Sequence, residues 1–155
     1  MKQRTYIDTS VIGGVFDPEF EIWSKRLLEE FRSGIRRMVL SDLTLRELEN
    51  APTNVRGLLD SVPSENKEMV LLDQEAETLA DRYIAEGGVP ERFRLDAQHI
   101  AIATISRADV LVSWNFKHIV NLRRIRIYNA INIKHGYHMM EIRSPREVLQ
   151  DEEEV

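Results

Sequence analysis

The sequence lacks several features that mark common classes of protein. It contains no cysteine, which excludes disulfide bonds and thiolate metal sites. Its four histidines form no His-x-x-x-His pair on a helix, so we do not expect a zinc site. No apolar run approaches the roughly 20 residues of a membrane span, and Asp8 interrupts the first apolar stretch too early for a signal peptide. We therefore expect a cytoplasmic protein with no membrane partner.

The net charge argues against bulk electrostatic attraction to nucleic acid. It is −5 at pH 7, whereas proteins that bind nucleic acid in this way are usually basic. The charge is uneven, however, because residues 116–134 carry only basic charges and the last five residues, DEEEV, carry only acidic ones. A local basic surface could therefore still contact phosphate. The length of 155 residues suits one domain over 1–150, followed by an acidic tail over 151–155.

Apolar patterning predicts that strands and helices alternate along the chain. Short apolar runs indicate strands at 5–7, 36–41, 68–72 and 109–113, with a further edge strand at 138–143. Helical spacing indicates helices at 17–34, 42–50, 73–88, 95–108 and 122–136, and Ser144 with Glu147 suits the start of a last helix. Such alternation forms a parallel sheet covered by helices on both faces. We predict an α/β fold, a three-layer α/β/α sandwich with a central, mostly parallel sheet of four to five strands.

Four polar residues map to one edge of this predicted sheet. Asp8 and Asn115 end the first and fourth strands, Glu47 lies just after the second, and Asp96 begins the most apolar helix. Each has a local interpretation: the two aspartates suit caps, Glu47 suits an exposed helix face, and Asn115 suits a turn. Ligands of an open parallel sheet bind outside the carboxyl ends of the strands. The shared position of the four residues therefore favours a site over four unrelated roles.

Several segments together resemble the PIN-domain family, specifically the toxin ribonucleases of VapC type. They are YIDTSVIGG, SDLTLRELEN, DAQHIAIATISRADVLVSWNFKHI and MEIRSPREV, and they span nearly the whole chain. The resemblance implies a parallel sheet between helices, and hydrolysis of RNA with Mg²⁺ or Mn²⁺ held by three or four acids. By position, Asp8, Glu47 and Asp96 match the first three acids. Asn115 stands where the family usually has Asp, and WNFKH is interpreted as the normal form of one branch.

The chemistry assigns roles to these four residues. Phosphodiester hydrolysis needs a nucleophilic water and stabilisation of charge on phosphate, and Mg²⁺ supplies both while it keeps several waters. We expect Asp8 and Asp96 to be direct ligands, and Glu47 to bind through water or to orient the attacking water. Asn115 can accept a hydrogen bond or donate one to phosphate, but it would hold a second ion poorly.

Neighbouring residues are expected to support the site. Thr9 and Ser10 suit either orientation of Asp8 or of a water, or a local turn. His99 lies one helical turn after Asp96 and is either a proton donor or a packed core histidine, the second being the safer interpretation. Four basic residues are expected to contact RNA phosphates, although Arg126 cannot share one helix face with both of the other arginines. They are Lys117, Arg123, Arg124 and Arg126.

Two functions from different classes remain at this point. The first is a metal-dependent ribonuclease, the toxin of a type II toxin–antitoxin pair, for which the resemblance implies a homodimer and a small antitoxin as partner. The second is a non-catalytic PIN module that binds RNA or a protein; Asn115 favours it, and the three intact acids oppose it. A nucleotide-binding module lacks support because neither a Gly-x-Gly-x-x-Gly motif nor a phosphate loop is present.

Overall fold

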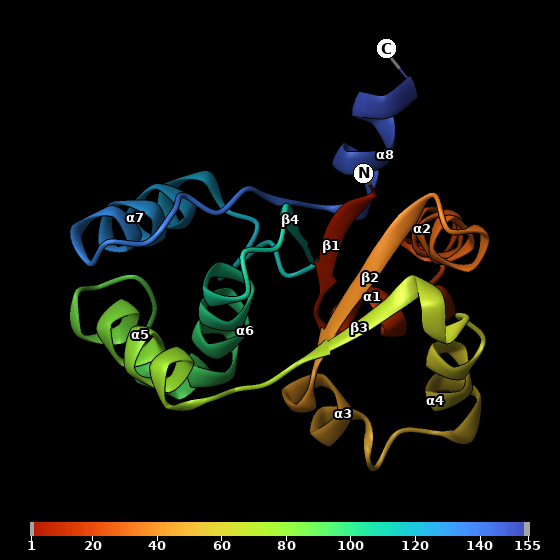
Figure 1. Cartoon of the computed structure of the whole chain (residues 1–155), viewed down its shortest axis with the longest axis horizontal. Coiled ribbons are helices and arrows are strands. Elements are labelled where there is room, and N and C mark those ends of the chain that lie inside the picture. Colours follow the sequence, from red (N-terminus) through yellow and green to blue (C-terminus); the bar gives the residue numbers. More distant parts are fainter. Residues whose placement is uncertain (1, 154–155) are drawn as a thin grey trace.

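The centre of the protein is a five-stranded sheet in which every paired strand is parallel to its neighbour (Figure 1). The computed structural model describes residues 2–153, with side chains through Leu149. The strand order is β3-β2-β1-β4-β5, so β1 is central. The strands are β1 (Gln3–Ile7), β2 (Arg36–Ser41), β3 (Lys67–Val70), β4 (Val110–Val112) and β5 (Ile142–Arg143). The sequence prediction of a parallel α/β sheet is confirmed.

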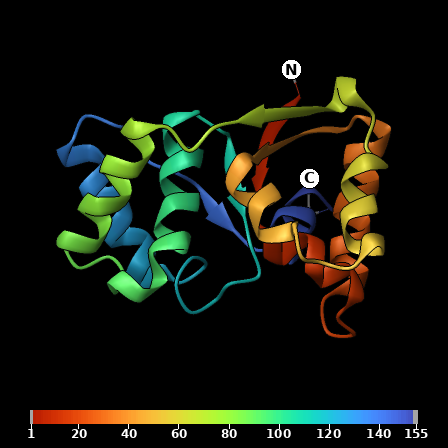
Figure 2. The same cartoon turned by 90° about the horizontal axis from the view of Figure 1, so that it is seen from below.

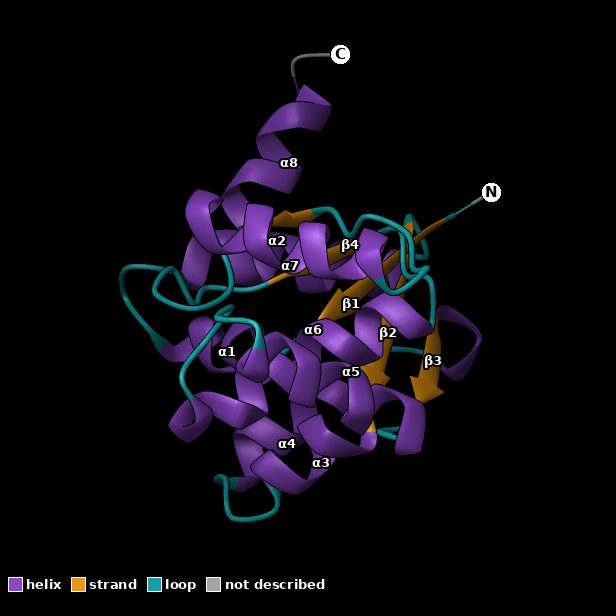
Figure 3. Cartoon of the chain, turned by 90° about the vertical axis from the view of Figure 1, so that its left-hand side faces the viewer, coloured by secondary structure: helices purple, strands orange, loops and turns teal. Residues whose placement is uncertain are grey.

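Helices cover both faces of this sheet. One face carries α5 (Gln74–Ala85), α6 (Arg94–Ile105) and α7 (Leu122–Lys134), on the left in Figure 1 and toward the viewer in Figure 3. The other carries α1 (Thr9–Gly13), α2 (Glu21–Ser33), α4 (Thr53–Asp60) and α8 (Pro145–Glu153). Short α3 (Asp42–Leu48) follows β2, and three 3₁₀ turns occupy Gly14–Phe16, Ser64–Asn66 and Glu91–Phe93. The three-layer sandwich is therefore confirmed.

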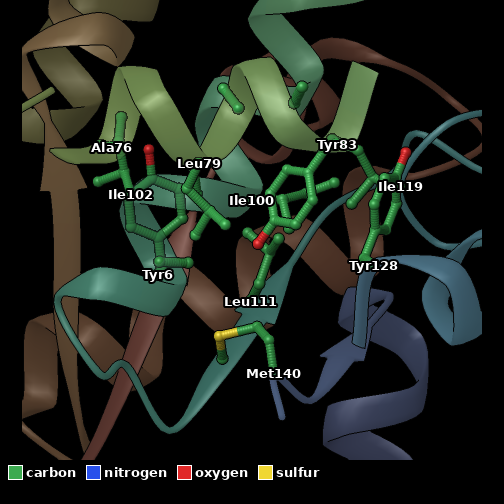
Figure 4. Close-up of a cluster of buried hydrophobic side chains, with 14 of the residues drawn as sticks. Tyr6, Ala76, Leu79, Tyr83, Ile100, Ile102, Leu111, Ile119, Tyr128 and Met140 are labelled. Atoms are coloured by element: carbon green, nitrogen blue, oxygen red, sulfur yellow. The ribbon is translucent and has the colours of Figure 1, made fainter. Parts of the chain in front are cut away.

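The alternation of side chains along the strands explains why both faces are buried. Tyr6 of β1 packs into the cluster under α5, α6 and α7, whereas the next residue, Ile7, packs on the opposite face. Leu111 of β4 joins Tyr6, together with Ile100 of α6 and Leu79 of α5 (Figure 4). Since a strand covered on both faces exposes neither side, it reads as a continuous apolar run. This is the pattern that identified the strands in the sequence.

Most helix boundaries follow local signals in the sequence. Asp73 caps α5 by accepting a hydrogen bond from the Ala76 N–H, 2.9 Å away. Ser144 and Glu147 form the reciprocal capping box that was predicted for α8, each side chain bonding the other's backbone N–H at 3.1 Å. The predicted tail at 151–155 begins inside α8, whose backbone is helical to Glu153, and residues 154–155 lie outside the described part. Among residues 2–153, no helix is long and apolar enough to cross a membrane.

Two helix starts differ from the prediction. α2 begins at Glu21, four residues later than expected, because Asp17 first forms a turn: its carboxylate accepts the Glu19 N–H at 2.9 Å. α6 begins at Arg94, with Phe93 at the cap position. The interpretation of Asp96 as a cap is therefore wrong, since this residue lies inside the first turn and its carboxylate is available for other contacts.

Candidate active site

The carboxyl ends of the three central strands bring polar residues together. Asp8 follows β1, Ser41 ends β2, and Ser113 follows β4. Because β1 pairs in parallel with both β2 and β4, Asp8 occupies the middle of this edge. Figure 2 views the molecule from below and shows the loop after β4 near the start of α6 at this edge. Of the sequence-predicted site residues, Glu47 lies close enough to Asp8 to raise its pKa, and Asp96 lies beside Asn115.

Asp8 is a buried carboxylate held by two hydroxyl groups. Ser10 Oγ donates to its Oδ1 and Ser113 Oγ to its Oδ2, both at 2.6 Å, and the residue is only 5% exposed. No Lys, Arg or His forms an ion pair with it in the described part of the chain. Burial raises the pKa of Asp8, the nearby Glu47 adds to the rise, and the charge of His99 and the hydroxyl hydrogen bonds oppose it. A buried charge of this kind is stabilised by a cation.

Glu47 is held by a buried histidine from the opposite side of the site. His99 Nε2 lies 2.5 Å from Glu47 Oε1, and its Nδ1 lies 2.7 Å from the hydroxyl of Tyr6. The same hydroxyl is 2.8 Å from Ser41 Oγ, and Ser41 also accepts the Thr44 N–H at the start of α3. Burial raises the pKa of Tyr6, so the phenol stays neutral. This chain of hydrogen bonds joins β1, β2, α3 and α6 behind the Glu47 carboxylate.

Asp96 is held by a second histidine, which the sequence analysis did not identify. His118 Nδ1 lies 3.1 Å from Asp96 Oδ2, and the imidazole contacts the ring of Phe93 with centroids 3.7 Å apart. Burial raises the pKa of Asp96, whereas the charge of His118 and a hydrogen bond from Asn115 oppose the rise. His118 is the last residue of the WNFKH motif and lies three residues after Asn115. This position in the motif could have identified it as a site residue from the sequence.

Asn115 forms the turn that was predicted for it. Its Oδ1 accepts the backbone N–H groups of Lys117 at 3.2 Å and His118 at 2.9 Å. Its amide also lies near Asp96 and opposes the rise in the pKa of that carboxyl. Because its Oδ1 is occupied by backbone donors, the NH₂ group is the part of the amide that remains to donate.

The remaining predicted residues divide into two groups. Ser10 contacts Asp8, whereas the Thr9 Oγ1 atom beside it is buried and has no hydrogen-bond partner in the described part of the chain. Lys117, Arg123 and Arg124 line one cavity near the site. Arg126 lines a different cavity, with Glu86 and Lys134, as expected from its position on another face of α7.

The donor set at this edge suits a hard divalent cation. Carboxylate and hydroxyl oxygens are the ligands that Mg²⁺ and Mn²⁺ prefer. Asp8 is buried without a cationic partner, and Thr9 Oγ1 next to it is unsatisfied. Within residues 2–153, no three His, Asp or Glu side chains lie close enough to enclose a metal ion by themselves. The residues therefore fit an ion with few direct protein ligands and several waters.

Comparison with known proteins identifies the fold. The sequence matches no family model and no curated protein. VapC20 of Mycobacterium tuberculosis, described as a sarcin–ricin loop cleaving toxin, superimposes with a TM-score of 0.56 and 16% identity over 74% of this chain and 92% of its own.

Two assemblies bound to DNA give similar values. A chain of VapBC2 from Rickettsia felis, bound to a promoter fragment, matches with a TM-score of 0.55 and 14% identity over 92% of this chain and 98% of its own. A chain of VapBC from Salmonella typhimurium matches with a TM-score of 0.54 and 18% identity over 94% and 99%. At such low identity these likenesses establish the architecture alone. The chain has the PIN-like α/β/α fold that is seen in VapC toxins.

Proposed function

We propose that this protein is a metal-dependent ribonuclease that hydrolyses RNA phosphodiester bonds. One observation carries the proposal: the buried Asp8 follows β1 of a PIN-like sheet, Glu47 lies close enough to raise its pKa, and Asp96 contacts His118 of the loop after β4. Each carboxylate is held in place by a hydroxyl or imidazole group. Burial and mutual repulsion of ionised acids destabilise the folded state, so their presence at this edge favours a functional role.

The proposed cofactor is Mg²⁺ or Mn²⁺. Asp8 and Asp96 would hold it directly, and Glu47 would contact it or its waters. When bound, the ion activates the attacking water and stabilises negative charge on the phosphate. Few direct ligands are needed because Mg²⁺ retains several waters.

The protein's own groups would fix the acids before the substrate binds. Ser10 and Ser113 each bond one oxygen of Asp8, so its carboxylate cannot rotate freely. The imidazoles of His99 and His118 orient Glu47 and Asp96 in the same way. Hydrogen bonds to the far side of a ligand hold it in its productive orientation. Asn115, next to Asp96, is placed to donate a hydrogen bond to a phosphate oxygen.

The biological role that we propose is that of a toxin in a type II toxin–antitoxin pair. Two of the three structural neighbours were solved as VapBC assemblies, which supports a small antitoxin protein as a partner. We also propose a homodimer, as the sequence resemblance implies, and a cytoplasmic location. A non-catalytic module that binds RNA or a protein is the competing function. It is favoured by Asn115 at the fourth position and by the absence, among the described residues, of three acids or histidines able to enclose an ion.

Cleavage of RNA by the purified protein tests the proposal. The assay compares Mg²⁺, Mn²⁺ and EDTA, and it compares the wild type with Asp96→Asn and with Asp60→Asn, an exposed acid on α4. We expect metal-dependent cleavage that is lost in Asp96→Asn and retained in Asp60→Asn. Absence of cleavage across varied RNAs, with folded protein free of antitoxin, would instead support the non-catalytic module.

A further inference from the structure

A basic cavity lies beside the candidate active site, between α7 and the loop that joins α5 to α6. Its volume is about 590 Å³, within the range of small-ligand pockets, roughly 300–1,000 Å³. Lys117, Arg123 and Arg124 line it together with Asn121. The other lining residues are Ile84, Gly87, Val89, Pro90 and Ile127, so no acidic side chain faces these three cations.

The three cations are not neutralised by the protein. Neither Lys117 nor Arg123 forms an ion pair within residues 2–153. Arg124 donates to the carbonyl of Gly88 at 2.7 Å, which orients its guanidinium without removing its charge. Lys117 lies 5.9 Å from the centre of the Phe93 ring, a contact that also leaves the ammonium charge available. The cavity therefore presents fixed positive charge to solvent.

The start of α7 strengthens this positive potential. Asn121 caps the helix by accepting the Arg124 N–H at 3.2 Å, and the first turn contains no acid. A helix N-terminus carries a partial positive charge, so arginines at this position are electrostatically unfavourable for the isolated protein. A bound anion would offset both the helix dipole and the side-chain charges. A bound anion therefore explains the positive charge at the start of α7 more simply than a contribution to the stability of the fold does.

Lys117 and His118 connect the cavity to the candidate active site along the chain. Lys117 lines the cavity, and the next residue, His118, contacts Asp96, with 3.1 Å between His118 Nδ1 and Asp96 Oδ2. A polyanion bound at the acids would therefore reach this cavity over a short length of its own backbone.

We infer that the cavity is a phosphate-binding subsite for an RNA strand whose scissile phosphate lies at the acids. The inference rests on the proposed function and deepens it. RNA is favoured over an acidic protein segment because a strand that crosses the active site necessarily carries further phosphates past Lys117. Arg126, on another face of α7, has no part in this subsite.

The first test measures binding of a labelled, mixed-sequence, single-stranded RNA by fluorescence anisotropy over a series of salt concentrations, with EDTA to prevent cleavage. The variants are Arg123→Gln and Lys117→Gln, and the matched control is Arg56→Gln, which removes the same charge from an exposed position on α4. Each cavity variant is expected to weaken binding and to reduce the slope of log affinity against log salt by about 0.7, the value for one contact to a single strand. The control is expected to leave the slope unchanged.

The second test separates this subsite from the proposed nuclease. In Mg²⁺, Arg123→Gln should lower kcat/KM for a long RNA more than for a dinucleotide, because a dinucleotide has no internucleotide phosphate besides the scissile one. Equal RNA binding by Arg123→Gln and Arg56→Gln would overturn the subsite, even if Asp96-dependent cleavage persists. Binding that depends on Arg123 without any cleavage would support the subsite and contradict the nuclease.

Discussion

His99 of α6 holds Glu47 of α3 across the edge of the sheet, with 2.5 Å between His99 Nε2 and Glu47 Oε1. An ionised carboxylate only accepts hydrogen bonds, so Nε2 is the donor. The His99 Nδ1 lies 2.7 Å from the Tyr6 hydroxyl. The buried ring is therefore fixed at both nitrogens, and it fixes Glu47 in turn.

Replacement of His99 should affect both stability and metal binding. We expect His99→Leu to lower the free energy of unfolding by about 1–3 kcal/mol, because Glu47 loses its imidazole partner and the buried Tyr6 hydroxyl keeps only Ser41. We also expect it to weaken Mn²⁺ binding by about 10- to 100-fold, the usual effect of losing an outer-shell hydrogen bond. Urea unfolding and calorimetric titration measure the two effects.

A second His–Glu pair outside the site provides the control for this experiment. His135 Nε2 lies 2.8 Å from Glu86 Oε2, next to Lys134. We expect His135→Leu to change stability by less than about 1 kcal/mol, as for a surface pair, and to leave Mn²⁺ affinity unchanged. Similar metal affinities in the two variants would show that His99 is a packing residue only.

The raised pKa of Asp8 predicts that stability depends on pH. Its folded pKa is raised by burial above the ordinary value of 3.8, so the folded state binds the proton more tightly than the unfolded state does. Below 3.8 the group favours folding, and this contribution is lost as the pH rises through the raised pKa. In EDTA, Asp8→Asn should therefore be more stable than the wild type at neutral pH. Each tenfold difference in proton affinity between the folded and unfolded states corresponds to about 1.4 kcal/mol of this gain.

Urea unfolding of the two proteins across this pH range checks the prediction. The difference between them should vanish below the ordinary pKa of Asp and reach a plateau at neutral pH. Added Mn²⁺ should stabilise the wild type and not Asp8→Asn. If the difference in unfolding free energy between the two proteins were the same at every pH, the charge of Asp8 would not destabilise the folded state.

Restoring an acid at position 115 should make stability depend on metal. Asn115→Asp can still accept the backbone N–H groups of Lys117 and His118, but it replaces a donor to Asp96 with a second negative charge. At about 4 Å such repulsion costs about 1–4 kcal/mol, depending on solvent exposure. We expect lower thermal stability than the wild type in EDTA and a larger gain with Mn²⁺.

Asn121→Asp is the matched control, because Asn121 caps α7 through the same type of backbone hydrogen bond. A carboxylate at this helix start should leave stability unchanged or slightly raise it, with or without metal. If Asn115→Asp responds to Mn²⁺ no more than this control does, position 115 lies outside the metal's reach.

Two adjacent glycines should respond in opposite ways to the same substitution. A Cβ at Gly14 would lie 2.5 Å from Ser24 Oγ and 2.7 Å from Trp114 Nε1, whereas a Cβ at Gly13 would meet no atom within 4 Å. We expect Gly14→Ala to destabilise the protein by about 1–3 kcal/mol through overpacking. Gly13→Ala, in a helical conformation, should stabilise it by about 0.4–1 kcal/mol.

Urea unfolding and the tryptophan emission spectrum measure the result. Trp114 donates to Ser24 Oγ at 2.8 Å, so a displaced indole should change its emission in Gly14→Ala alone. Since Trp114 precedes Asn115, the same variant should also reduce cleavage. Equal stability of the two variants would contradict the close packing of Trp114 against Gly14.

The sequence was sufficient for the order of the strands and of the helices other than α1 and α4, which were not predicted. Strands buried on both faces appear as apolar runs, and caps such as Asp73 and Ser144 act within three residues, so both are visible locally. Once the strands are known to be parallel, topology alone places Asp8, Glu47 and Asp96 at the same edge. The start of α2 was predicted four residues too early. Residues 17–20 are compatible with both a turn and a helix, and the structure has the turn.

Only the tertiary structure decided which groups hold which acids. His99 is one turn from Asp96 on the same helix, yet its ring bonds Glu47, 52 residues away. His118, from the loop after β4, takes the place beside Asp96 instead. These pairs depend on how α3, α6 and the β4 loop pack around the end of the sheet, and the spacing of residues along one helix contains no information about that packing.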